Sequence, residues 1–169
     1  MRIQLVQDLI NYTRKDLVKQ LKQYLNEIRC KTSKIVFVYR KNTENIGDLN
    51  CCPCLYFKEF SGYPSIDILD FKNINIKNKI IIAGGGGFFQ KYFDESIKHF
   101  DKLSENNKII YWGAGTDNTF NEELMGPDFL EKAALVGIRD KNTKYHFVPC
   151  VSCMSGIIDK YRVSTPPEK

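Results

Sequence analysis

Four continuous apolar runs, each of strand length, constrain the fold of this chain more than any other feature. They occupy residues 35–39, 79–83, 108–112 and 134–139. Runs of β-branched and aromatic residues are typical of strands that are buried on both faces of a parallel sheet. Segments of helix length separate the runs. We therefore predict an α/β fold built on a doubly wound, Rossmann-like parallel sheet.

The same runs predict the hydrophobic core. We expect the core to contain these residues: Ile35, Val36, Phe37, Ile80, Ile81, Ile82, Ile109, Ile110, Leu135 and Val136.

Weaker patterns predict the remaining elements. Residues 65–70 alternate between apolar and polar side chains, which indicates a strand nearer an edge, and residues 145–148 form a short last strand. The first thirty residues predict a helix with Thr13 as a candidate N-cap. Its apolar positions recur at spacings of three and four: Leu17, Val18, Leu21, Tyr24, Leu25 and Ile28. Residues 51–60 and 88–103 are also expected to be helical, with Pro53 in a first turn.

The length of 169 residues and the 43% hydrophobic content fit one domain with a sizeable core. We divide the chain into a helical segment (1–30), a Rossmann-like α/β domain (31–163) and a linker-like tail (164–169). No apolar run approaches the roughly 18 residues of a membrane span, so we do not expect an integral membrane protein. The first residues do not resemble a secretory signal, which favours a cytoplasmic location.

The charge pattern argues against a nucleic-acid partner. The chain has 25 Lys and Arg residues against 20 Asp and Glu residues. The lysines are spread along the chain and interleaved with acids, whereas nucleic-acid binders usually cluster basic residues that include Arg. The mild excess suits a small anionic substrate, and it equally suits a solvated lysine surface.

Six cysteines raise the question of a metal site. Cys52 and Cys54 form one close pair, and Cys150 and Cys153 form another, so together they could supply four zinc ligands. The single-residue spacer of the first pair is short for a zinc knuckle, and no histidine pattern accompanies it. We predict reduced, metal-free thiols, with a zinc site or a redox pair as alternatives.

Glycines or polar residues follow several of the predicted strands. In an open parallel sheet the carboxyl ends of the strands line one crevice, where ligands bind. Glycine backbone amides and an arginine in that crevice would suit a phosphate or carboxylate group. The alternative is that the glycines only make tight turns and that Arg139 pairs with Asp140. The candidate binding residues are Asn45, Gly47, Asp48, Gly84, Gly85, Gly86, Gly87, Gly113, Gly115, Arg139 and Asp140.

These motifs, in this order, resemble the polysaccharide pyruvyl transferase family over about residues 34–161. The matching segments are 45–48, 82–87, 111–115 and 137–140, and residues 148–154 resemble one branch of the family. The resemblance implies transfer of an enolpyruvyl unit from phosphoenolpyruvate to a sugar of a glycan or of a lipid-linked acceptor. It implies phosphoenolpyruvate as the donor substrate, and we expect no further cofactor and no metal. It also implies that Arg139 helps to bind the donor phosphate.

The resemblance also implies a part that this chain lacks. Family members resemble two-domain GT-B glycosyltransferases, and their catalytic histidine and a further phosphate-binding arginine lie in the second domain. Neither histidine of the chain matches that position: we expect His99 to be a surface residue, and His146 is only a weak catalytic candidate. We therefore expect an N-terminal half that works with a second-half domain or as a homo-oligomer.

Two other functions remain open. The chain could be the N-terminal domain of a GT-B glycosyltransferase that uses a nucleotide sugar. It could also be a non-catalytic interaction scaffold.

Overall fold

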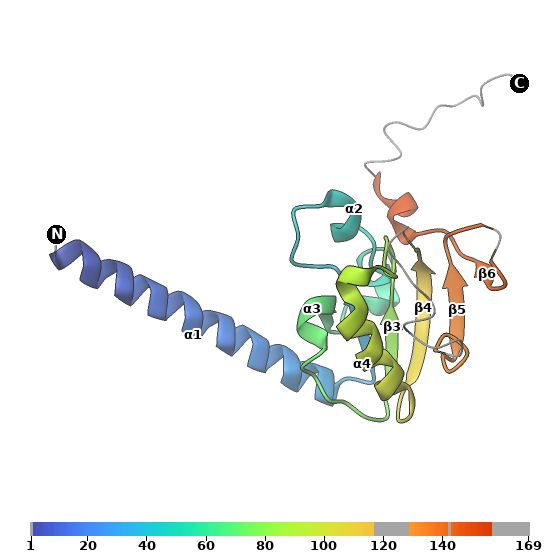
Figure 1. Ribbon diagram of the computed structural model, residues 1–169, viewed down its shortest axis with the longest axis horizontal. Coiled ribbons are helices and arrows are strands. Elements are labelled where there is room, and N and C mark those ends of the chain that lie inside the picture. Colours follow the sequence, from blue (N-terminus) through green and yellow to red (C-terminus); the bar gives the residue numbers. More distant parts are fainter. Residues whose placement is uncertain (1, 117–128, 142, 157–169) are drawn as a thin grey trace, which may run out of the picture.

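The protein is built on one parallel sheet, with helices packed against it (Figure 1). The computed structural model describes residues 2–116, 129–141 and 143–156. The strands are β1 (Ile35–Tyr39), β2 (Ser65–Asp67), β3 (Ile80–Ala83), β4 (Lys108–Ala114), β5 (Leu135–Ile138) and β6 (His146–Phe147). The helices are α1 (Arg2–Thr32), α2 (Ile46–Leu49), α3 (Ile68–Phe71) and α4 (Asp94–Ser104). Short 3₁₀ turns lie at Pro53–Leu55, Lys58–Phe60, Lys91–Phe93 and Val151–Met154.

All strand pairs within the described residues are parallel, in the order β2-β1-β3-β4-β5-β6. This confirms the predicted Rossmann-like α/β fold. β1 lies between β2 and β3, so the order of strands changes direction there, and such switch points are where open sheets bind ligands. β2 is an edge strand, as predicted. Because the strands are parallel, all their carboxyl ends reach one edge of the sheet.

The larger core cluster lies between the sheet and helices α3 and α4, which lie in front of the sheet in Figure 1. Phe71 and Phe100 pack as a tilted pair with ring centroids 4.8 Å apart, and Phe89 packs against Tyr111 of β4 with centroids 5.2 Å apart. Burying several aromatic side chains together supplies a large share of the apolar area removed from water.

The opposite face holds a smaller cluster covered by the turns of residues 51–63. Phe37 and Ile82 are buried there, and Trp112 is half-buried. The cluster takes residues from β1, β3 and β4 but none from β5. This explains why the core prediction is wrong for Leu135, which begins β5 and is 62% exposed.

The other predicted core residues are buried or pack against the core. Val36, Phe37, Ile81, Ile82 and Ile109 are buried. The remaining four are partly buried and pack against one of the two clusters: Ile35, Ile80, Ile110 and Val136.

Three predicted elements are shorter or different in the structure. The strand expected over residues 65–70 ends at Asp67, because the Asp67 side chain accepts a hydrogen bond from Leu69 N and starts α3. The helix expected over 88–103 begins only at Asp94, since Phe89 first makes a parallel bridge with Thr116. The helix expected over 51–60 is replaced by two 3₁₀ turns, with Pro53 at the start of the first.

Helix α1 extends away from the sheet, with its last turn anchored in the core by the fully buried Cys30 (Figure 1). It begins at Arg2 and continues past Thr13, so the N-cap prediction was wrong. Its apolar stripe is exposed, with Leu17 at 60% and Tyr24 at 61%. Within the described residues no helix combines the length and the apolar character needed to span a bilayer. The predicted tail (164–169) and residues 157–163 of the predicted domain lie outside the described part.

Candidate functional site

A pocket of about 370 Å³ opens at the carboxyl edge of the sheet, and chain segments that follow different strands line it. Its lining residues are Asn45, Gly47, Asp48, Gly86, Gly87, Gln90, Thr116, Arg139, Cys150 and Ser152. The structure thus brings together six of the residues predicted from sequence. They are Asn45, Gly47, Asp48, Gly86, Gly87 and Arg139.

The segment after β1 provides the acidic side of the pocket. Asn45 caps α2, and its Oδ1 atom accepts a hydrogen bond of 2.9 Å from Gly47 N. This turn directs Asp48 at the glycine loop: a Cβ atom on Gly86 would lie 2.9 Å from Oδ1 of Asp48. Burial raises the pKa of Asp48 above its usual range, and nearby Arg40 and Arg139 offset part of that rise. Asp48 is therefore better suited to accept a proton than an ordinary surface carboxylate.

The glycine loop after β3 has two roles. Gly84 and Gly85 allow close packing of the backbone, and Gly86 and Gly87 line the pocket. Gly85 has a φ of 81°, and a Cβ atom there would lie 2.0 Å from Cys51 O, so the backbone packs against the 51–63 segment. Gly84 likewise packs against the backbone of Trp112. Gly86 N donates to Sγ of Cys150 over 3.3 Å, so this amide is engaged within the protein.

Arg139 follows β5 and is the basic side chain of the pocket. Its backbone N–H donates to Ala114 O at 2.9 Å, which fixes the residue beside the end of β4. The guanidinium crosses Gly115, where a Cβ atom would lie 2.1 Å from Nε of Arg139. Gly115 therefore contributes by leaving space for Arg139 and does not line the pocket itself.

Asp140 binds Thr116 more closely than it binds Arg139. Its Oδ2 atom accepts hydrogen bonds from Thr116 N at 2.6 Å and from Thr116 Oγ1 at 3.0 Å. The Arg139 Nε to Asp140 Oδ1 distance is 3.9 Å, the outer limit of an ion pair, and both side chains are about one-third exposed. In the described residues Arg139 has no closer carboxylate partner, so its guanidinium is available to a ligand.

Gly113 and the two histidines lie outside the pocket lining. Gly113 sits at the irregular register between β4 and β5, with a φ of 60°, and packs against the backbone of Pro149. His146 is exposed on the edge strand β6. His99 is half-buried on α4, with Nε2 2.8 Å from Ile74 O and its ring against Phe71, so the expectation of a surface residue was wrong.

Four lining residues were not among the predicted binding residues: Gln90, Thr116, Cys150 and Ser152. The Gln90 side-chain amide donates to Gly87 O, which holds the loop closed. Cys150 is buried, and its sulfur accepts hydrogen bonds from Gly86 N and from Ser152 Oγ. Cys150 and Ser152 follow β6, so the rule that pointed to Arg139 could have been extended to them.

The two cysteine pairs do not come together as four ligands of one site, although Cys52, Cys54 and Cys150 all belong to the smaller core cluster. Cys52 and Cys54 lie with their sulfurs 2.9 Å apart, whereas Cys150 lines the pocket and Cys153 is exposed. Across the described ranges, no group of three or more His, Cys, Asp or Glu side chains gathers to hold a metal ion.

The pocket therefore combines one guanidinium with one carboxylate, and both are surrounded by amide and hydroxyl groups. A guanidinium offers a planar set of donors that matches a phosphate or a carboxylate. The Asp48 carboxylate and the amide oxygen of Asn45 are acceptors suited to hydroxyl groups. Such a site can hold an anionic substrate beside a polyhydroxylated one. Comparisons with protein-family models, with curated proteins and with solved structures find no match.

Proposed function

We propose that the chain is a polysaccharide pyruvyl transferase-like protein that transfers an enolpyruvyl unit from phosphoenolpyruvate to a sugar of a glycan or of a lipid-linked acceptor. One observation carries the proposal. Arg139 enters the same pocket as Asp48 and Gly87, and these residues come from three of the segments on which the resemblance rests.

In this proposal Arg139 binds the phosphate or carboxylate of phosphoenolpyruvate. Two charge-assisted N–H bonds from one guanidinium would fix the orientation of the group as well as its position. The partly exposed guanidinium can rotate toward a ligand without breaking a close ion pair, since its contact to Asp140 is 3.9 Å long.

Asp48 acts on the acceptor in the same proposal. A sugar hydroxyl donates to the Asp48 carboxylate, whose raised pKa favours taking up the proton as the hydroxyl oxygen adds to C2 of phosphoenolpyruvate. A proton reaches C3 at that step, and a second hydroxyl then displaces phosphate from C2. A diol and phosphoenolpyruvate thus give a cyclic ketal and inorganic phosphate. The resemblance assigns the acid that protonates C3 to a second domain, so the proposal also requires that domain.

Calorimetric titration of phosphoenolpyruvate tests the donor site, in the presence of the second domain that the proposal requires. Arg139→Ala should weaken binding by about tenfold or more, because a hydrogen bond to a charged group contributes about 1.5–3 kcal/mol. Lys141→Ala is the matched control: it removes one exposed cation from the same loop, outside the pocket. Equal affinity of Arg139→Ala and the unmodified chain would refute the assignment. Tighter binding of a nucleotide sugar than of phosphoenolpyruvate would favour the glycosyltransferase alternative.

A further inference from the structure

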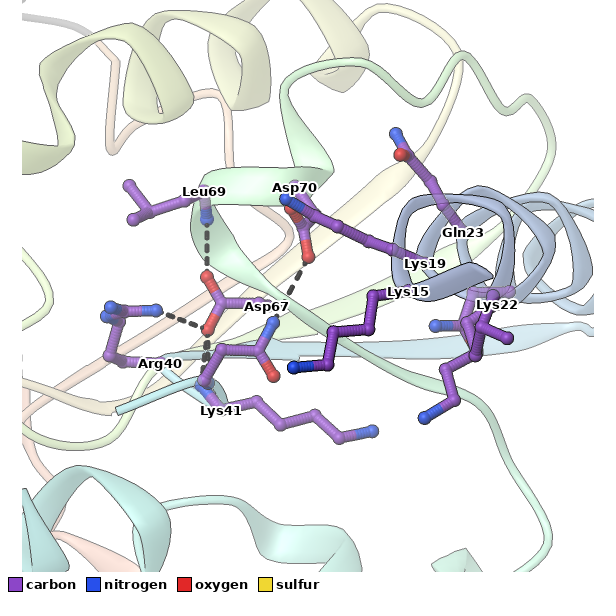
Figure 2. Close-up of a pocket in the computed structure, with 12 residues that line it drawn as sticks. Lys15, Lys19, Lys22, Gln23, Arg40, Lys41, Asp67, Leu69 and Asp70 are labelled. Carbon is purple, nitrogen blue, oxygen red and sulfur yellow. Dashed lines mark hydrogen bonds and ion pairs between the residues drawn. The ribbon is translucent and has the colours of Figure 1, made fainter. Parts of the chain in front are cut away.

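A second concave site lies between α1 and the carboxyl ends of β1 and β2 (Figure 2). It is a cleft of about 750 Å³, and five cationic side chains line it against two carboxylates. Lys15, Lys19 and Lys22 come from α1, and Arg40 and Lys41 follow β1. The two carboxylates are Asp67 and Asp70, at the end of β2 and in α3.

Both carboxylate oxygens of Asp67 accept hydrogen bonds from neighbouring residues. It is 2% exposed, and its Oδ2 atom accepts hydrogen bonds from Arg40 Nη1 at 2.7 Å, Lys41 N at 2.7 Å and Asn42 N at 2.6 Å. Its Oδ1 atom accepts a fourth bond from Leu69 N. Asp67 therefore neutralises Arg40 and organises the backbone there, which leaves Asp70 as the other carboxylate of the cleft to offset the four lysines.

The lysines have no carboxylate partner in the described part of the chain. Lys41 donates to Ser65 O and Ser65 Oγ at 3.3 and 3.2 Å, and Asp70 accepts a bond from the Asn42 side chain. In Figure 2, Lys15 and Lys19 extend from α1 across the cleft, and Lys41 extends in the opposite direction toward the helix. Four ammonium groups therefore share one remaining carboxylate, Asp70, on a concave surface, and a bound anion would offset the excess positive charge.

The orientation of α1 is the reverse of ordinary core packing. A helix that covers its own domain normally turns its apolar stripe inward. Here the lysine face of α1 lines the cleft, whereas Leu17, Leu21 and Tyr24 are 57–61% exposed. The side of α1 that faces the domain is therefore mainly cationic, with Val18 as its apolar residue in the lining.

We infer that this cleft binds a ligand with a diphosphate or two neighbouring phosphate groups. Lys15 and Lys22 are seven residues apart, or about 10 Å along the helix axis, so a single phosphate cannot reach the whole row of ammonium groups. Two linked phosphates can contact ammonium groups of α1 on one side and that of Lys41 on the other. The inference does not depend on the proposed pyruvyl transfer, because none of these residues lines the pocket that contains Arg139.

The experiment is a calorimetric titration of inorganic pyrophosphate into the full chain at low salt. We expect saturable binding that the double variant Lys19→Gln/Lys22→Gln weakens by about tenfold or more. Both side chains are exposed, so the variant should fold normally. The control Lys98→Gln/Lys102→Gln makes the same change in net charge at exposed positions of α4 and should alter the affinity by less than about twofold.

Two further variants and probes separate the outcomes. Arg139→Ala removes the cation of the other pocket, so pyrophosphate that still binds this variant is bound in the cleft. Loss of binding in Arg139→Ala but not in Lys19→Gln/Lys22→Gln would overturn the inference, as would equal losses in the α4 control. Phosphatidylcholine vesicles with and without cardiolipin, whose headgroup has two phosphates, distinguish the sources of the ligand. Sedimentation with cardiolipin that pyrophosphate displaces indicates a lipid headgroup, and pyrophosphate binding alone indicates a soluble ester.

Discussion

Arg139 lies directly against Gly115, so closely that a Cβ atom on Gly115 would be 2.1 Å from Nε and 2.9 Å from Cζ of the arginine. The two residues follow the neighbouring strands β4 and β5. The guanidinium can therefore occupy this position in the pocket only because residue 115 is a glycine, which has no Cβ atom.

Gly115→Ala should therefore move the Arg139 side chain while Arg139 itself is unchanged. We expect anion binding in the pocket to fall about tenfold, as for Arg139→Ala, because the donors no longer meet the ligand. The free energy of unfolding should change by less than about 0.5 kcal/mol, since the flexible arginine can shift. Sulfate titration and urea denaturation measure the two effects. Gly62→Ala, at a site with nothing within 4 Å, should change neither. Unchanged sulfate affinity in Gly115→Ala would contradict the assigned contact.

Asp67→Asn should destabilise the chain by roughly 3 kcal/mol, because it leaves Arg40 without its buried partner. The amide also replaces an oxygen that accepts three hydrogen bonds. Guanidinium denaturation measures the loss.

Asp70→Asn is the matched control, since Asp70 accepts an exposed hydrogen bond from the Asn42 side chain and does not organise the backbone. It should cost less than about 0.5 kcal/mol. Similar losses for the two variants would show that the Asp67 network contributes little.

Sulfate binding in the Arg139 pocket should strengthen as the pH falls through the pKa of Asp48. The pKa of this carboxyl is raised by burial, so it takes up its proton at a higher pH than an ordinary aspartate. Protonation removes a negative charge beside Arg139, and sulfate keeps its charge over the range from about pH 7 to pH 4. Asp48→Asn should bind sulfate tightly at neutral pH and lose the pH dependence. A pH profile that is identical in both proteins would exclude Asp48 as the cause.

The same group links stability to pH. Because its pKa is higher in the folded state than the usual value of 3.8, the folded chain holds this proton more tightly than the unfolded chain. The contribution of Asp48 to stability is therefore most favourable at low pH and falls as the pH rises through the folded pKa. Asp48→Asn should accordingly be more stable than the unmodified chain at neutral pH. Urea denaturation at pH 7 measures the difference, and a lower stability would contradict it.

The thiols should differ in reactivity toward a disulfide reagent such as Ellman's reagent. Cys153 is exposed, and a hydrogen bond from the Cys52 thiol lowers the pKa of Cys54, so these two should react first. Burial raises the pKa of Cys30 to about 11 and that of Cys51 to about 12, so both should react only on unfolding. Peptide mass spectrometry identifies the labelled residues. In denaturant without reductant, all six thiols should react; a smaller number would contradict the prediction of reduced cysteines.

Much of the fold follows from local patterns. The run of residues 35–39 is apolar throughout because β1 has neighbours on both sides and cover on both faces. The rule that parallel strands end at one edge of a sheet also predicts that Asp48, Gly86 and Arg139 meet, and all three line one pocket. These inferences succeed because they need only the sequence period and the direction of the strands.

Other features depend on what covers a residue, which no local pattern records. Leu135 belongs to an apolar run, yet it is exposed. The turns of residues 51–63 cover β1, β3 and β4 on that face of the sheet but do not extend over β5. The lysines of α1 alternate with apolar residues as in any surface helix. The lysines of α1 line one cleft with Arg40 and Asp67 because of the angle between α1 and the sheet, and the sequence period does not encode that angle.

The position of β1 between β2 and β3 has a consequence for the order in which the chain can assemble. Ile35 pairs with Ile80, so the second neighbour of β1 is made 45 residues later. At a synthesis rate of about 5–20 residues per second, the apolar residues of β1 wait roughly 2–9 s for β3. During that time at least one edge of β1 has its backbone N–H and C=O groups unpaired and open to other chains. Vectorial synthesis thus leaves an interior strand of the finished sheet open to other chains until β3 has been made.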